Sequence, residues 1–171
     1  MALPQRLWIL GPCGSGKSWV ADDLAARLGV AATHLDDIFW NPGWVKSSMD
    51  EVAAGIQPIM HRDRWVVDGN YRELRRQFAD QIELYVWLDL PLRVTLPRVL
   101  ARCMRRSLRR EPCCNGNFET LRRTFAHRDS LLLWAITSDR PRRAELSDEL
   151  TTQRHVRLRS QAEIDRWLAE G

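Results

Sequence analysis

The octapeptide at residues 11–18 constrains the fold of this chain more than any other stretch of its sequence. It reads GPCGSGKS and matches the phosphate-binding pattern G-x-x-x-x-G-K-[ST] at every fixed position. The apolar residues 6–10 before it suit a short buried strand, and residues 19–28 after it predict a helix that ends at Gly29. This pattern forms a phosphate-binding loop only between a strand and a helix. The sequence predicts the loop and both of these flanking elements.

Each residue type in this loop has a physical role. Glycines let the backbone curl so that successive N–H groups point inward, and the following helix adds the positive end of its dipole. Lys17 can reach the outer phosphates of a nucleotide, and the Ser18 hydroxyl can ligate Mg²⁺. We therefore expect ATP, or another nucleoside triphosphate, to bind together with Mg²⁺. The binding residues are Gly11, Pro12, Cys13, Gly14, Ser15, Gly16, Lys17 and Ser18.

The chain length of 171 residues suits a single domain spanning residues 1–171. No apolar run approaches the ~20 residues needed to span a bilayer, and the N-terminus lacks a secretory apolar region. We expect no membrane partner and a cytoplasmic location. The four cysteines lack the spacing of a disulfide framework, so we expect reduced thiols. The oligomeric state does not follow from the sequence.

Apolar runs alternate with helix-length segments along the whole chain, which predicts a three-layer α/β/α fold with a five-stranded parallel sheet. In sheets of this kind the ligand lies beyond the carboxyl ends of the strands. Gly11, Asp36, Asp68 and Asp89 are expected at that edge. The expected strands are residues 6–10, 32–35, 65–68, 84–89 and 155–158, and the expected helices are residues 19–28, a segment from about 49, 91–111, 119–137 and 161–169.

Polar and aromatic side chains follow the second and third expected strands. Asp36 is suited to orient an alcohol and accept its proton, although a capping role beside a strand end is the alternative. Asp68 is suited to hold Mg²⁺, again with capping as the alternative. The aromatic residues could form a wall for a flat or sugar-like acceptor, or simply pack in the core. They are Phe39, Trp40, Trp44 and Tyr71.

Arginine dominates the positive charge of the chain. Of the 26 basic residues 24 are Arg, and seven of these lie between Leu90 and Arg110, where there is no Asp or Glu. Like charges on one helix face repel each other. With no carboxylate expected nearby, the segment predicts an anionic partner such as phosphate groups, nucleic acid or an acidic protein surface. One helix face carries Arg98, Arg102, Arg105 and Arg109. Candidates to contact the same anionic partner from a second side are Arg122, Arg123 and Arg128.

These motifs resemble the nucleoside-monophosphate-kinase branch of P-loop proteins. The chain is most similar to small adenylate-kinase-related proteins labelled "DNA topology modulation protein". The carrying stretches are GPCGSGKS (11–18), LDDIFWNPGWV (35–45), VVDGNYR (66–72), the segment 87–111 and the segment 115–136. Adenylate kinases carry D-G-[FY]-P-R after the third strand, and residues 68–72 read DGNYR, with Asn-Tyr in place of Phe-Pro.

The resemblance implies several roles at the nucleotide site. Asp68 would work near Mg²⁺, and Arg72 would meet a phosphate of the acceptor. Arg98 and Arg102 follow Asp89-Leu90-Pro91 at the spacing of two phosphate-gripping arginines. A short mobile lid is implied between the last two long helices, with residues 111–118 as its candidate.

Two functions fit these observations. The first is Mg-ATP-dependent phosphoryl transfer to a nucleotide or another small molecule. Lys17, Asp36, Arg98, Arg102 and Arg105 would then be catalytic, and Asp36, Trp40, Tyr71 and Arg72 would bind the acceptor. The base would be Asp36 for an alcohol, whereas a phosphate acceptor would need Arg72 instead. The second function is a nucleotide-gated nucleic-acid-binding protein without kinase turnover, to which the Arg-rich helix would contribute.

Overall fold

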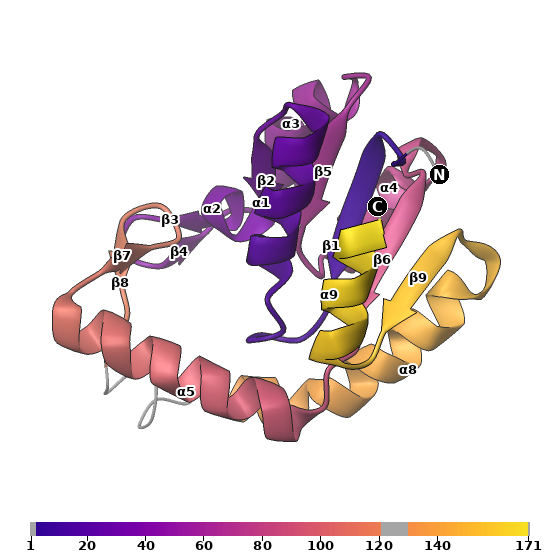
Figure 1. Cartoon of the computed structure of the whole chain (residues 1–171). Coiled ribbons are helices and arrows are strands. Elements are labelled where there is room, and N and C mark those ends of the chain that lie inside the picture. The colour runs from indigo at the N-terminus through magenta and orange to yellow at the C-terminus, as the bar shows by residue number, and fades with distance from the viewer. Residues whose placement is uncertain (1–2, 121–129, 171) are drawn as a thin grey trace.

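A five-stranded parallel sheet forms the centre of the protein. The computed structural model describes residues 3–120 and 130–170. The strand order is β2-β5-β1-β6-β9, so the phosphate-loop strand β1 is central (Figure 1). The bounds are β1 Arg6–Leu10, β2 Ala32–His34, β5 Trp65–Asp68, β6 Leu84–Leu88 and β9 His155–Leu158. All five predicted strands are confirmed, within one residue at their ends.

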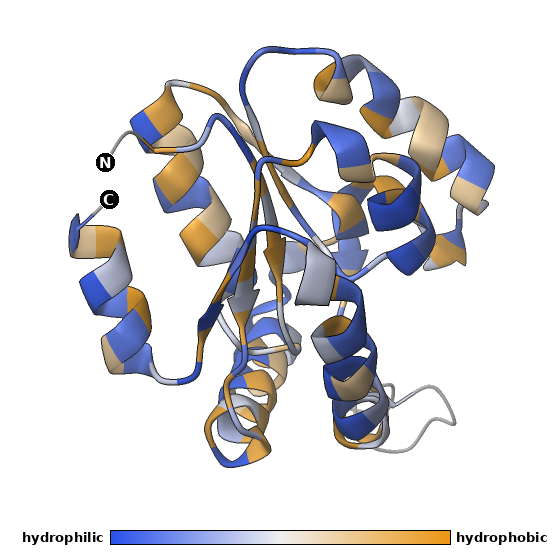
Figure 2. Cartoon of the chain, turned by 90° about the vertical axis from the view of Figure 1, so that its right-hand side faces the viewer, coloured by the Kyte–Doolittle hydropathy of each residue, from blue (hydrophilic) through white to orange (hydrophobic). Residues whose placement is uncertain are grey.

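Helices cover both faces of this sheet and complete the three layers. Helices α1 (Lys17–Leu28) and α9 (Gln161–Glu170) pack on one face, where they meet the Leu7 and Ile9 side chains of β1. Helices α3 (Met49–Met60), α4 (Arg72–Gln77) and α8 (Asp139–Glu149) pack on the other, against Trp8 and Leu10. The hydropathy pattern shows helices with one apolar and one polar side around the strands (Figure 2).

The central strands are buried on both faces, which explains why they are continuous apolar runs rather than alternating ones. All residues of β5 and β6 are buried. Trp8 and Trp65 meet edge to face, with ring centroids 6.4 Å apart. The Trp8 indole N–H donates to the carbonyl oxygen of Gly69 at 2.9 Å. A large core residue of β1 therefore also fixes the backbone that follows β5.

Helix α5 (Leu92–Arg109) lies across the carboxyl-terminal edge of the sheet, where the phosphate loop also lies (Figure 1). Pro91 is its N-cap residue, as its fixed φ suits a helix start, and Pro97 is accommodated inside the helix. The prediction for residues 91–111 is thus confirmed within two residues. No helix among the described residues is long and apolar enough to cross a membrane.

Two small hairpins lie side by side at one end of α5 (Figure 1). The first joins β3 (Trp40–Asn41) to β4 (Val45–Lys46) and follows the short helix α2 (Leu35–Phe39). The second joins β7 (Pro112–Cys113) to β8 (Asn117–Phe118). Neither hairpin is predicted by the sequence, because strands of two residues are too short to show an alternating pattern. The second one lies within the predicted lid, residues 111–118.

Other segments also differ from the sequence predictions. Leu35 begins α2 instead of ending β2, so Asp36 lies in the first turn of a helix. The predicted helix 119–137 begins too early: Glu119 and Thr120 are not helical, residues 121–129 lie outside the described part, and α7 (Leu131–Thr137) starts after the N-cap Ser130. The sequence prediction also omits α8 and the short 3₁₀ turns Ala79–Gln81 and Leu150–Thr152. Helix α8 buries Asp139 and Arg142 together with Leu146, so its sequence carries only a weak apolar stripe.

Candidate active site

The phosphate loop is held in a tight curve that only glycine permits at two positions. A Cβ atom on Gly11 would lie 2.6 Å from the carbonyl oxygen of Leu88, and one on Gly14 would lie 2.5 Å from that of Thr95. Gly14 and Gly16 also have φ values of 79° and 90°. The loop is therefore wedged between the end of β6 and helix α5, as a rigid phosphate cradle requires.

Unpartnered polar atoms in and beside the loop fit an anionic ligand. Within residues 3–120 and 130–170, the buried Oγ atom of Ser15 and the buried Nε atom of Arg102 have no hydrogen-bond partner. The Lys17 ammonium donates to the carbonyl oxygen of Pro12 at 3.3 Å, within its own loop. The α1 N-terminus begins directly at Lys17, with no acidic residue in its first turn. The unpartnered Ser15 and Arg102 groups, together with the N-terminus of α1, are what a triphosphate would satisfy.

The side chain of Asn70 fixes the position of Gly11, where the loop begins. The Asn70 side chain accepts a hydrogen bond from the Gly11 N–H at 3.1 Å and donates one to the Gly11 carbonyl oxygen at 2.7 Å. The amide thus pairs with both backbone groups of Gly11, beyond Ile9, the last residue of β1 that pairs with β5. This position is where the sequence departs from the D-G-[FY]-P-R pattern. The departure consequently has a structural role that the pattern alone does not reveal.

Arg102 comes to the loop from α5. Its Nη2 atom lies 3.0 Å from the Cys13 Sγ atom. Burial alone would lower the pKa of the Arg102 guanidinium, but the Cys13 thiol and the Glu119 carboxylate outweigh burial and raise it. Arg102 therefore stays charged beside the phosphate loop. Of the four arginines predicted to share a helix face, this one lines the same cavity as Lys17.

Oxygen atoms suited to Mg²⁺ meet next to Lys17. The Ser18 hydroxyl donates to Asp68 Oδ2 at 2.9 Å, so the two residues predicted as metal ligands are neighbours. Both supply the oxygen atoms that a hard cation prefers, and Asp68 is buried. Within the described residues, no cluster of three or more His, Cys, Asp or Glu side chains could hold a metal without further ligands. Phosphate oxygens would complete such a site, as Mg²⁺ usually requires.

Sequence reasoning missed His34, which lies beside Asp68. Its Nδ1 atom lies 2.7 Å from Asp68 Oδ1, and its Nε2 atom lies 3.2 Å from Asp22 Oδ1. The hydrogen bond with Asp68 and the charges of Asp68 and Asp22 raise the pKa of His34 to about 9, against the opposing effect of burial. His34 is opposite Asp68 in the parallel register of β2 and β5. Its position at the end of a predicted strand was therefore the sequence signal that could have placed it near Asp68.

The residues predicted to bind an acceptor form an acidic and aromatic group. The Tyr71 hydroxyl donates to Asp36 Oδ1 at 2.7 Å. Burial, followed by the charge of Asp36, raises the pKa of Tyr71, so the phenol remains a donor. Phe39 contacts both Tyr71 and Trp40, with ring centroids 5.2 and 4.9 Å apart, and Trp40 contacts Trp44 at 5.4 Å. The four aromatic residues therefore form one continuous wall.

A single cavity extends from the phosphate loop to the aromatic wall. Its volume is about 1050 Å³, enough for a triphosphate terminus and a small acceptor together. The predicted site residues that line it are Cys13, Lys17, Ser18, Asp36, Trp40, Asp68, Tyr71 and Arg102. Sequence reasoning missed other lining residues, among them His34, Lys46 and Arg106. The Lys46 ammonium lies 5.7 Å from the centroid of the Trp40 ring, which places a cation beside the aromatic wall.

Other predicted site residues lie elsewhere. The Arg72 Nε atom is 3.7 Å from Glu145 of α8, and Arg72 does not line the large cavity. Arg105 and Arg109 both lie near Glu111, at 3.2 and 3.9 Å. The expectation that no carboxylate offsets the arginine repulsion is therefore wrong, because Glu111 lies just past the helix end. Arg122, Arg123 and Arg128 lie outside the described residues.

Asp89 lies at the predicted edge of the sheet, directly after β6, but it is buried and its carboxylate is taken up by ion pairs. Its Oδ1 atom lies 2.7 Å from Arg143 Nη1, and its Oδ2 atom lies 2.7 Å from Arg157 Nη2. Arg75, which is also buried, pairs similarly with Glu145 and Glu149. These pairs connect the sheet and α4 to α8. Asp89 and Arg75 thus stabilise the position of a helix.

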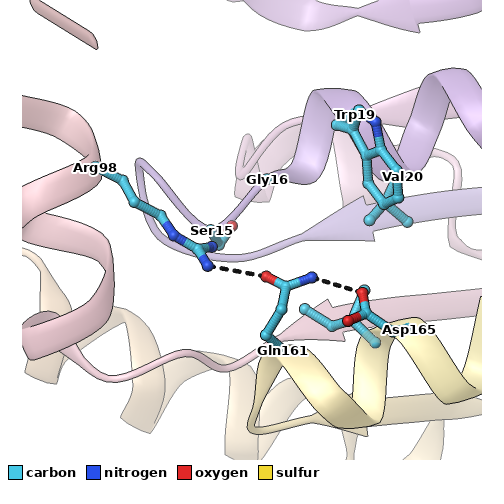
Figure 3. Close-up of a pocket in the computed structure, with 8 residues that line it drawn as sticks. Ser15, Gly16, Trp19, Val20, Arg98, Gln161 and Asp165 are labelled. Carbon is cyan, nitrogen blue, oxygen red and sulfur yellow. Dashed lines mark hydrogen bonds between the residues drawn. The ribbon is translucent and has the colours of Figure 1, made fainter. Parts of the chain in front are cut away.

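A smaller hollow of about 370 Å³ lies on the other side of the phosphate loop, between α1 and α9 (Figure 3). Ser15, Gly16 and Trp19 line it from the loop and the start of α1. Arg98 reaches it from α5 and donates to Gln161 Oε1 at 3.0 Å, and Gln161 in turn donates to Asp165 at 2.8 Å (Figure 3). Arg98 therefore lies at a different hollow from Arg102, one helical turn away on α5.

The predicted lid segment, residues 111–118, borders the large cavity. Cys113 and Cys114 of its hairpin line the cavity. A hydrogen bond from Cys114 lowers the pKa of the Cys113 thiol, and the same contact raises that of Cys114. Arg106 of α5, also at the cavity, pairs with Glu119 at 3.0 Å just after the hairpin. The segment is thus anchored to α5 at its base.

Comparison with known proteins gives structural likeness without sequence likeness. No protein-family model and no curated protein matches the chain. A gluconokinase from Sinorhizobium meliloti 1021 is similar over 99% of this chain and 97% of its own, with 18% identity and a TM-score of 0.56. A shikimate kinase from Bacteroides thetaiotaomicron is similar over 97% and 95%, with 15% identity and a TM-score of 0.58.

A sugar kinase from Janibacter sp. HTCC2649 is similar over 98% of this chain and 94% of its own, with 15% identity and a TM-score of 0.55. At such low identities the likeness concerns the fold alone. It extends over nearly the whole described architecture, from the phosphate-loop strand to α9. The chain has the three-layer α/β/α fold, with a five-stranded parallel sheet, that these P-loop kinases share.

Proposed function

We propose that this protein is a magnesium-dependent kinase that transfers the γ-phosphoryl group of ATP to a hydroxyl group of a small molecule. One observation carries the proposal: a single cavity is lined by Lys17 and Ser18 of the phosphate loop and by the Asp36–Tyr71 pair. The phosphate loop and a carboxylate suited to accept a proton therefore line the same cavity, as transfer to a hydroxyl group requires.

The residues at the phosphate end bind and orient the triphosphate. The loop N–H groups, the Ser15 hydroxyl and Lys17 would contact the phosphates, and Arg102 would add charge from α5. Ser18 and Asp68 would hold Mg²⁺, which supplies charge neutralisation on the phosphates when bound. The nucleoside would extend into the smaller hollow beside Trp19 and Arg98, because the larger cavity contains the acceptor residues.

Asp36 would act on the acceptor. A hydroxyl oxygen of the acceptor forms the new bond to the γ-phosphorus atom, the bond from phosphorus to the bridging oxygen breaks, and ADP leaves. The hydroxyl proton passes to the Asp36 carboxylate, which the Tyr71 hydroxyl holds in place at 2.7 Å. A hydroxyl acceptor is favoured over a nucleoside monophosphate because Arg72, the residue expected to meet an acceptor phosphate, lies against Glu145 instead.

The structural neighbours are consistent with this proposal. They are a gluconokinase, two shikimate kinases and a sugar kinase, one of the shikimate kinases in complex with shikimate. All of these proteins are kinases of small molecules. The nucleic-acid-binding alternative has weaker support, since Arg105 and Arg106 are paired with Glu111 and Glu119.

ADP release measured against a panel of acceptors tests the proposed activity. The panel comprises polyols, sugars, sugar acids, nucleosides and nucleoside monophosphates, each with Mg-ATP. We expect at least one hydroxyl compound to raise ADP release well above the acceptor-free rate, and the Lys17→Ala protein to lose this response. If only a nucleoside monophosphate stimulated release, the hydroxyl assignment and the role of Asp36 as base would both be wrong.

A further inference from the structure

Two hairpins that are far apart in the sequence form the outer end of the cavity. The β3–β4 hairpin supplies Trp40, Trp44 and Lys46, and the β7–β8 hairpin supplies Cys113 and Cys114. Each hairpin has strands of only two residues. Isolated two-stranded hairpins are marginally stable in water even when they are longer. Some contact outside each hairpin must therefore hold it in position.

Asn117 of β8 provides that contact. Its side chain is 3% exposed, although it lies in a hairpin at the edge of the protein. Its Oδ1 atom accepts a hydrogen bond from the Trp44 backbone N–H at 2.8 Å. Its Nδ2 atom donates to the carbonyl oxygens of Asn41 at 2.9 Å and Cys114 at 2.7 Å. One amide thus satisfies backbone groups of both hairpins.

The partner backbone is shaped to receive this side chain. Trp44 has φ of 61°, a left-handed conformation that is costly for a large residue other than glycine. The Trp44 N–H then lies against Asn117, and the Trp44 indole N–H donates to the Phe118 carbonyl oxygen at 3.2 Å. Three hydrogen bonds between described residues therefore cross from one hairpin to the other. An uncommon backbone conformation is retained where it allows these bonds.

Resting on the proposed function, we propose that Asn117 is a positioning residue that couples the lid hairpin to the acceptor wall. It holds Trp40 and Trp44 in the cavity and at the same time keeps β7–β8 closed over it. An acceptor or a triphosphate that stabilises one hairpin then stabilises the other. Without Asn117, the two hairpins separate and water enters the cavity, so that acceptor-free ATP hydrolysis increases.

Amide hydrogen exchange on the full chain tests the coupling without knowledge of the acceptor. In the unliganded Asn117→Ala protein, the Trp44 amide should exchange about tenfold faster or more than in the wild type, since its buried acceptor is gone. Asn117→Asp keeps the Oδ1 acceptor but places a buried carboxylate oxygen against the carbonyl oxygens of Asn41 and Cys114, so an increase at least as large is expected. Unchanged exchange at Trp44 in both variants would overturn the proposal.

A matched control comes from the opposite hairpin. Asn41→Ala removes an exposed side-chain hydrogen bond to Ser47 but leaves the backbone carbonyl that Asn117 contacts. This variant should exchange like the wild type at Trp44. If Asn41→Ala and Asn117→Ala had equal effects, a general loosening of β3–β4 would explain both, and the specific role of Asn117 would be lost.

A second measurement adds a non-hydrolysable ATP analogue with Mg²⁺. In the wild type the analogue should slow exchange across residues 40–46, and in Asn117→Ala this protection should be largely absent while analogue affinity changes less than about threefold. Acceptor-free ADP release should rise in the variant by several fold. Equal protection in both proteins would refute the coupling. Failure of the analogue to bind the wild type would refute the proposed function, and the exchange of the unliganded proteins would still test the coupling of the two hairpins by Asn117.

Discussion

The two ends of the large cavity are built in opposite ways. The phosphate end is a run of eight consecutive residues, Gly11 to Ser18, between a central strand and its helix. The acceptor end combines α2, two hairpins and Tyr71, which come from segments up to 76 residues apart and meet through side-chain hydrogen bonds. Local backbone chemistry therefore forms the first end, and long-range contacts form the second. The first should tolerate little change in the loop itself, whereas the second should depend on distant partners.

The largest expected effect is at the phosphate end. Lys17→Ala should reduce the acceptor-stimulated rate of ADP release by about 10³-fold, because it removes the cation beside the transferred group. Arg109→Ala is the control, since Arg109 is exposed and lies 3.9 Å from Glu111 outside the cavity. Its rate should stay within about twofold of the wild type. A Lys17→Ala enzyme with wild-type turnover would remove the basis for assigning this end to phosphate binding.

At the acceptor end, Asp36→Asn should lower kcat by about 10²-fold or more while ATP affinity stays nearly unchanged, because only the proton acceptor is lost. Tyr71→Phe keeps the ring in the wall but removes the hydrogen bond to Asp36, so its effect should be smaller. Steady-state kinetics with an acceptor from the panel gives both values. If Asp36→Asn mainly weakened ATP binding, the division of the cavity into two ends would be wrong.

Glycine substitutions compare the two ends in terms of stability. Gly14→Ala should lower the free energy of unfolding by about 3 kcal/mol, since its Cβ would lie 2.5 Å from the Thr95 carbonyl oxygen in a left-handed backbone. Gly43→Ala, in the β3–β4 turn, has a similar φ of 78° but no atom within 4 Å of its Cβ. It should cost about 1 kcal/mol. Urea denaturation measures both, and equal losses would show that the phosphate loop is no more tightly packed than the hairpin turn.

A smaller effect is expected from pH at the phosphate end. The pKa of His34 is raised from 6.5 to about 9 in the folded protein, so His34 stabilises the fold fully below pH 6.5 and loses this contribution as pH rises through 9. His34→Gln should therefore be less stable than the wild type by about 2 kcal/mol at pH 6, with the difference disappearing by pH 10. Denaturation of the metal-free proteins at several pH values tests this. A difference independent of pH would mean that His34 is not charged beside Asp68.

Particular residues show which parts of the fold can be predicted from the sequence. Ser48 and Glu51 form a reciprocal capping box at the start of α3, where the sequence indicates a helix start. The central strands and the turn at Gly29 are equally local, and they are confirmed. The acceptor-side hairpins are missed because nothing in two-residue strands distinguishes them from loops. Helix α8 is missed because it buries ion-paired residues such as Arg142 and Asp139, which read as a solvent-exposed segment.

The predicted site residues also divide into those that lie together as expected and those that tertiary packing places elsewhere. Lys17, Ser18 and Asp68 meet because the carboxyl ends of adjacent parallel strands share one edge, which follows from strand order. Asp36 and Tyr71 meet in the cavity, but Arg72, one residue further on, lies against Glu145. The arginines of α5 separate in the same way, with Arg98 and Arg102 at different hollows. The helical periodicity of a sequence predicts which residues share a helix face. Which other residues that face contacts depends on how the remaining elements pack around it.

The sequence by itself determined the phosphate loop, the alternation of strands and helices, and hence the layered parallel sheet. These features depend on residues close together in the chain, through backbone conformation and burial. The tertiary structure alone decided that Asn70 holds Gly11, that His34 pairs with Asp68, and that Asn117 joins two hairpins. Each of those contacts joins groups more than thirty residues apart, and residues that are close in the sequence do not determine which two groups meet across such a separation.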